Sequence, residues 1–105
     1  MIPSLSILDT ASAMARHAGH VHAVVADNIA RADLPGATAK GAMPFAEALR
    51  ATASGEAMTA RDTGAPISLD DQMVAMAQNA GRHDAAVTIW SRTLDMIRLA
   101  GASPR

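Results

Sequence analysis

Residues 68–101 read SLDDQMVAMAQNAGRHDAAVTIWSRTLDMIRLAG, and the spacing of apolar residues in this stretch decides the fold. Ser68 is suited to cap a helix, and Asp70 and Asp71 place negative charge in its first turn. The helix would be about 48 Å long, so it needs a partner of similar length. Residues that are mostly apolar or small recur in steps of four and three, and this spacing predicts one seam of a helix that packs lengthwise on a partner. The predicted seam consists of Leu69, Met73, Met76, Ala80, His83, Val87, Trp90, Leu94, Ile97 and Gly101.

The same rhythm occurs near the start of the chain and predicts a helix over residues 7–33. We expect this helix to pair antiparallel with 68–101 at a crossing angle of about 20°. It ends at residues 33–36, because Pro35 disfavours helix at the residue before it and Gly36 tolerates a positive φ. Residues 1–8 carry weak local signals and are expected to be loose. The predicted seam consists of Ile7, Ala11, Met14, Ala18, Val21, Val25, Asn28 and Ala32, flanked by Leu8, Ala15, His22 and Ile29.

Residues 34–67 are interrupted by glycine and proline and show no alternating strand pattern. We predict one short helix over 44–53, with Pro44 in its first turn and Phe45, Ala48 and Leu49 on one side. Residues 54–66 are expected to be flexible. The predicted fold is all-α, a single domain over 1–105 with two long helices paired like a coiled coil. Strands, a globular pocket or terminal helices out of contact would contradict it.

Composition excludes several classes of protein. The chain has 105 residues, a net charge of −1, no cysteine and two aromatic residues, Phe45 and Trp90. It therefore forms no disulfide or thiolate metal site, and nothing indicates a general attraction to nucleic acid. No apolar run is long enough to span a bilayer. The N-terminus lacks a basic region before Asp9, so a cleaved secretory signal is not expected.

Three histidines cluster in the first helix. His17 and His20 share a helical face, as metal ligands would, but no third ligand is close in sequence and His22 points away. We therefore predict surface or packing histidines and no metal site. His83 lies on the seam and is expected to be partly buried with one satisfied nitrogen.

Asn28 is the polar member of the first seam. It either fixes the register of the helix pair or caps the turn at residues 33–36. The chain contains serine, histidine and aspartate, but no serine lies in the sequence pattern of the nucleophile elbow of a hydrolase. The sequence also has no glycine-rich loop of the kind that binds phosphate. The chain is thus predicted to have no catalytic residue, no cofactor and no small-molecule substrate.

Residues 28–36, NIARADLPG, resemble the signature NNIANADTPGY that ends the N-terminal helix of flagellar rod and hook proteins. Residues 68–77, 82–88 and 94–98 are similar to the end of the short proximal-rod members of that family, and residues 44–49 to their middle element. Arg31, Leu34 and Ala37 depart from the family pattern. The turn motif carried over comprises Asn28, Ile29, Ala30, Asp33, Pro35 and Gly36.

The resemblance implies a non-enzymatic building block of the flagellar basal body. Such subunits pass unfolded through the flagellar type III export channel, without a cleaved signal, and polymerise in the periplasm through their terminal helices. The implied partners are copies of itself, other flagellar rod subunits, the rod-to-ring adaptor and the export gate. Nucleic acid is not among them.

The physics of the last helix favours assembly independently of the resemblance. Near its end this helix is apolar on several sides, and a single intramolecular partner cannot cover all of them. We expect the isolated chain to be partly unfolded and to gain order on polymerising. Two alternatives remain open: a small helical adaptor or export chaperone, which a stable dimer would favour, and a metal-dependent helical enzyme, which tight zinc or iron binding would favour. The residues concerned are Ile89, Trp90, Leu94, Met96, Ile97 and Leu99.

Overall fold

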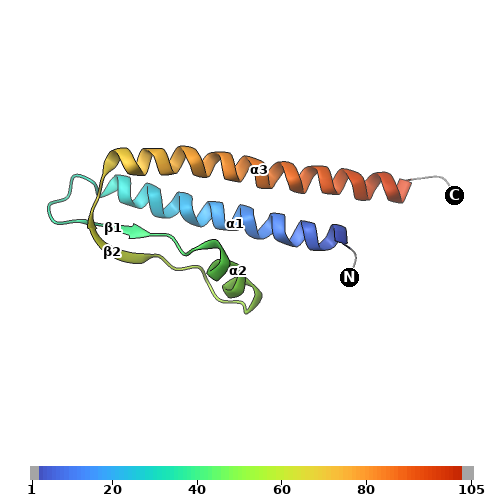
Figure 1. The fold of residues 1–105 in the computed structure, drawn as a ribbon, viewed down its shortest axis with the longest axis horizontal. Coiled ribbons are helices and arrows are strands. Elements are labelled where there is room, and N and C mark those ends of the chain that lie inside the picture. Colours follow the sequence, from blue (N-terminus) through green and yellow to red (C-terminus); the bar gives the residue numbers. More distant parts are fainter. Residues whose placement is uncertain (1–2, 103–105) are drawn as a thin grey trace.

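The computed structural model describes residues 3–102 and shows an elongated molecule, 67 × 27 × 14 Å, built mostly of helix (Figure 1). Two long terminal helices lie side by side and antiparallel, with a small strand-and-helix segment along one of them. Within the described residues, no helix is long and apolar enough to cross a membrane. In chain order the elements are α1 (Pro3–Ala30), β1 (Thr38–Gly41), α2 (Phe45–Ala53), β2 (Arg61–Pro66) and α3 (Leu69–Ala102).

The two long helices start and stop close to where local signals place them. The Asp71 N–H donates to the Ser68 hydroxyl oxygen at 3.3 Å, so Ser68 caps α3. Helix α1 begins at Pro3, within the stretch expected to be loose, and ends at Ala30. Gly36 has a φ of 75°, which allows the chain to turn back toward β1. Residues 1–2 of that stretch lie outside the described part of the chain.

The side of α3 that is buried against α1 carries small side chains and one buried amide. On α3 the buried residues are Asn79, Ala86 and Thr93, spaced by seven, as expected for a helix that supercoils about a partner. The Asn79 amide donates to the Ala18 carbonyl oxygen of α1 at 2.7 Å. Ala11 and Ala18 of α1 are buried as well. Small residues in this row allow the two backbones to approach closely.

This buried row differs from the seam predicted for α3. Each buried residue comes one position before a predicted one, so that Asn79 replaces Ala80 and Ala86 replaces Val87. Within one chain the bulkier residues of the predicted row lie beside the helix contact. Met76, Leu94 and Ile97 are half-buried, and the exposed members are Leu69, Met73, Ala80, His83, Val87, Trp90 and Gly101. On α1, by contrast, the predicted row of Met14, Ala18, Val21, Val25 and Asn28 is buried or half-buried.

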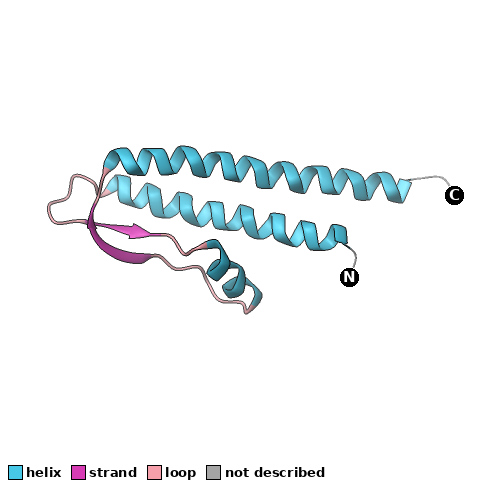
Figure 2. Cartoon of the chain, viewed as in Figure 1, coloured by secondary structure: helices cyan, strands magenta, loops and turns pink. Residues whose placement is uncertain are grey.

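The prediction of a purely helical fold is wrong in the middle segment. β1 and β2 form a two-stranded antiparallel ribbon in which Thr38 pairs with Pro66 and Lys40 with Asp62 (Figure 2). β2 also occupies six residues that were expected to be flexible. All of β2 is exposed, so it has no buried face and no apolar alternation that a sequence pattern could detect. Polar side chains hold the ribbon instead: Thr63 donates to the Ala39 carbonyl oxygen at 2.7 Å.

The short helix α2 packs on α1. Pro44 occupies its N-cap position, and Ala48 and Ala51 are buried. Phe45 contacts the ring of His17 on α1 edge to face, with the ring centres 5.5 Å apart. In Figure 1, α1 lies between α3 and the segment formed by β1, β2 and α2. This arrangement gives α1 neighbours on two sides and leaves α3 with one.

Candidate functional site

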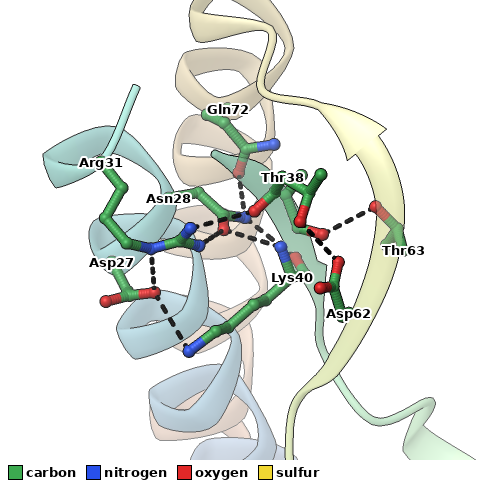
Figure 3. Close-up of polar contacts among 9 residues, drawn as sticks. Asp27, Asn28, Arg31, Thr38, Lys40, Asp62, Thr63 and Gln72 are labelled. Atoms are coloured by element: carbon green, nitrogen blue, oxygen red, sulfur yellow. Dashed lines mark hydrogen bonds and ion pairs between the residues drawn. The ribbon is translucent and has the colours of Figure 1, made fainter. Parts of the chain in front are cut away.

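Asn28, in the last turn of α1, joins three elements of the fold (Figure 3). Its side chain is 1% exposed. The amide nitrogen donates to the Lys40 carbonyl oxygen at 2.9 Å and to Oε1 of Gln72 at 3.0 Å. The amide oxygen accepts from the Lys40 N–H at 2.8 Å and from Nη2 of Arg31 at 2.9 Å. These four bonds use both donors and both acceptor positions of the side chain.

The pairing with Lys40 imitates a neighbouring strand. Asn28 satisfies both the N–H and the C=O of that residue in β1, as a strand backbone would, while its other donor reaches Gln72 in α3. The side chain therefore fixes β1 and the start of α3 relative to the end of α1. We call the group Asn28, Arg31, Lys40 and Gln72 the Asn28 junction. The side chain of Asn28 bonds to these partners and not to the turn at residues 33–36, which was the alternative role expected for it.

Arg31 extends the Asn28 junction to the solvent side. Its Nη1 donates to the Thr38 carbonyl oxygen at 3.0 Å, and its Nε pairs with Asp27 at 2.9 Å. Lys40 Nζ lies 3.7 Å from the same carboxylate. The hydrogen bond from Arg31, then the charges of Arg31 and Lys40, lower the pKa of Asp27 despite some opposing desolvation.

A second carboxylate locks the ribbon. The Thr38 hydroxyl donates to Asp62 Oδ1 at 2.7 Å, and the Gly64 N–H donates to the same oxygen at 2.9 Å. These two bonds, the backbone one first, lower the pKa of Asp62. An ionised aspartate thus contributes to holding the ribbon through these two bonds.

Of the remaining residues of the predicted turn motif, Ile29 and Ala30 end α1, and Asp33, Pro35 and Gly36 lie in the connection that follows it. The Leu34 N–H donates to the Arg31 carbonyl oxygen at 3.0 Å, and the Ala37 N–H donates to the Leu34 carbonyl oxygen at 3.2 Å. Asn28 is the motif residue whose side chain bonds to both β1 and α3. Ile29 is half-buried, and the exposed members are Ala30, Asp33, Pro35 and Gly36.

Sequence reasoning missed Gln72 and Asn79, the two α3 amides that bond to α1. One signal was available: these amides stand seven residues apart, in line with Ala86 and Thr93. A row of small and amide residues at heptad spacing marks a close helix contact as well as an apolar row does. Lys40 left no such signal, because its backbone makes the bond.

The first two histidines of the predicted cluster bind the backbone of a single residue, Met43. His17 Nε2 lies 2.7 Å from the Met43 carbonyl oxygen, and the Met43 N–H donates to His20 Nε2 at 2.9 Å. His22 and His83 are exposed, so the expectation of a partly buried His83 is wrong. Among the described residues, no group of three histidine or carboxylate side chains is placed to hold a metal ion.

Large apolar side chains remain exposed along α3. We call these residues the α3 outer surface, and they lie on more than one side of the helix. Met96 is 69% exposed and Met73 is 59% exposed. A hollow of about 250 Å³ lies where Val87 and Trp90 border Ala11 and Ala15 of α1. The α3 outer surface consists of Leu69, Met73, Val74, Val87, Ile89, Trp90, Met96 and Leu99.

Comparison of the chain with models of protein families, with curated proteins and with solved structures found no match.

Proposed function

We propose that this protein is a structural subunit of the bacterial flagellar basal body, a proximal rod subunit that polymerises through its terminal helices. The observation that carries the proposal is the α3 outer surface. A helix of 34 residues has one intramolecular partner along one side and keeps bulky apolar residues exposed on the others. Exposed apolar surface of this extent is typical of a protein–protein contact.

The energetics favour several neighbours over one. Full burial of a methionine, valine or leucine side chain contributes about 1.5–3 kcal/mol. The α3 outer surface includes residues on opposite flanks of the helix, such as Met73 and Met96, which one flat partner surface does not cover together. A tube in which each helix contacts neighbours on several sides buries both flanks.

The resemblance of residues 28–36, 68–77, 82–88 and 94–98 to the flagellar rod and hook proteins is the reason for proposing that this assembly is the rod. The first motif contains Asn28 and the second contains Gln72, and these two side chains bond to each other at 3.0 Å. Both motifs therefore include residues of the Asn28 junction, which holds the terminal helices in register. This contact supports the proposal because the two motifs meet in one structural unit.

The proposed partners follow from the proposed role. The chain packs against copies of itself and other flagellar rod subunits, close to the rod-to-ring adaptor and the export gate at the membrane end. It reaches the periplasm unfolded through the flagellar export channel. It acts without catalysis, cofactor, metal, nucleic acid or small-molecule substrate.

The direct test is to isolate hook–basal bodies from the bacterium that encodes the chain and to probe them for it. We expect the chain in the rod fraction, and we expect cells lacking its gene to build no rod and to be non-motile. Recovery of the chain as a soluble dimer bound to export substrates, with none in the rod, would contradict the proposal and would instead identify an adaptor or chaperone.

A further inference from the structure

Two histidines of α1 hold the backbone N–H and C=O of one residue, Met43, in the connection between β1 and α2. His17 and His20 are three residues apart and share a helical face, with ring centres 6.3 Å apart. One ring nitrogen contacts the Met43 carbonyl oxygen at 2.7 Å, and the other accepts the Met43 N–H at 2.9 Å. Both polar atoms of the Met43 backbone are thus satisfied by side chains of a single helix.

The chemistry of Met43 fixes the protonation of both rings. A carbonyl oxygen only accepts, so His17 Nε2 carries a hydrogen. An N–H only donates, so His20 Nε2 carries a lone pair. Protonation of His17 leaves its bond intact, because the imidazolium still donates from Nε2. Protonation of His20 removes the lone pair and sets two N–H groups against each other.

We propose that His17 and His20 form a pH-sensitive clasp that holds the β1–α2 connection on α1 at neutral pH and releases it when His20 is protonated. The released segment is the part of the chain around Met43, together with the start of α2. The inference concerns contacts within one chain and does not depend on the proposed function. It assigns a role to two of the three histidines that the sequence predicts to be surface or packing residues.

The surroundings of the clasp favour the closed form at neutral pH. Partial burial, followed by the positive charge that His17 can carry, lowers the pKa of His20. On α3, the cation Arg82 lines the same hollow as His17 and Phe45. On α2, Glu47 is paired with Arg61 of β2 at 3.5 Å. The Arg82 cation therefore lies on the His17 side of the clasp, and the Glu47 carboxylate already has Arg61 as its partner.

The sign of the pH dependence follows from this lowered pKa. When the segment is released, the pKa of His20 returns to the ordinary histidine value of 6.5. His20 therefore binds a proton more tightly in the released form than in the closed form. The clasp therefore has its full strength above about pH 6.5 and loses it as the pH falls below that value toward the lowered pKa of His20. The Asn28 junction contains no histidine and stays closed over this range, so release is local to the α2 end of the segment.

The test is an NMR titration of the full chain between pH 8 and pH 5, at a concentration where circular dichroism shows the helices formed. The ring nitrogens of His20 and the amide signals of Met43 and Lys40 are followed together. We expect a lone pair on His20 Nε2 at pH 8. We also expect the Met43 amide to lose its hydrogen-bond shift and its exchange protection at the pH where His20 is half protonated, which should lie below pH 6.5. The amide signal and the protection of Lys40 should not change.

Two variants separate the clasp from general acid sensitivity. His20→Phe should leave the Met43 amide unprotected at every pH and abolish its titration. The matched control is His22→Gln, which changes an exposed histidine of the same helix and should keep the transition. A hydrogen on His20 Nε2 at pH 8, a Met43 amide that does not follow His20, or parallel loss of Lys40 protection would overturn the proposal. The wild-type titration decides the question if His20→Phe does not fold.

Discussion

Helices α1 and α3 carry the same four–three rhythm but are buried to very different degrees. α1 contacts α3, α2 and β1, whereas α3 packs on α1. The buried side chains of α3 are Asn79, Ala86 and Thr93, and those of α1 are Ala11, Ala13, Ala18, Val24, Val25 and Asn28. The middle segment explains the difference, because it covers the second side of α1 and leaves α3 uncovered. The comparison shows that a periodic pattern identifies a helix without saying how many partners that helix has.

The largest effect is expected where α1 meets its two neighbours. Asn28→Leu should destabilise the chain by about 4 kcal/mol, since it removes four hydrogen bonds of a buried side chain at about 1 kcal/mol each. Denaturation followed by circular dichroism measures the change in the free energy of unfolding. Gln78→Leu, which replaces an exposed amide of α3, is the control and should change it by less than about 0.5 kcal/mol. Assembly of the Asn28→Leu variant with normal stability and unchanged register would contradict the role of the Asn28 junction.

The next effect concerns the α3 outer surface. Met73→Gln combined with Met96→Gln should raise the protein concentration needed for assembly about 100-fold. The reason is that two methionines that become buried on assembly contribute about 3 kcal/mol together. Helix content within a folded chain should not change, since both residues are exposed there. Sedimentation velocity over a concentration series measures the shift. Arg92→Gln introduces the same side chain at another exposed position of α3 and should assemble normally.

A smaller effect is expected inside the helix contact. Asn79→Leu removes one hydrogen bond and leaves the Ala18 carbonyl oxygen without that donor, at a cost of about 1–3 kcal/mol. Thermal unfolding should show a lower Tm than the wild type but a smaller loss than Asn28→Leu. An equal loss for the two variants would mean that the register depends as much on the middle of the helix pair as on its end.

The smallest effect is expected on acidification of the ribbon. The pKa of Asp62 is lowered in the folded chain, so its ionised form stabilises the fold above the ordinary value of 3.8. That contribution is lost as the pH falls below 3.8 through the lowered pKa. Asp62→Asn should therefore lower the Tm slightly at pH 7 and make no difference at pH 2. A variant that differs from the wild type equally at both pH values would contradict the assignment.

Much of the helical framework could be predicted from the sequence because its signals are local. Periodicity located both long helices, Pro35 and Gly36 placed the break after the first, and Pro44 marked the start of the short one. The ribbon could not be found in this way. β2 is exposed throughout and held by Thr63 and Asp62, so it lacks the alternation of a half-buried strand.

The candidate site was only partly accessible to sequence reasoning. Asn28 stood out as a polar residue on an apolar seam, but its partners depend on tertiary contacts across 12 residues to Lys40 and 44 residues to Gln72. The buried row of α3 was missed because it consists of small and amide residues, next to a more apolar row. Bulk and burial diverge here because helices that approach closely require small side chains between them.

Assembly through the α3 outer surface is tested most directly by the dependence of helix content on protein concentration, measured by circular dichroism together with sedimentation. We predict that the dilute chain is partly unfolded and that helix content rises as elongated assemblies form, because only neighbours cover the α3 outer surface. A helical monomer with a sharp melting transition that does not depend on concentration would contradict this claim.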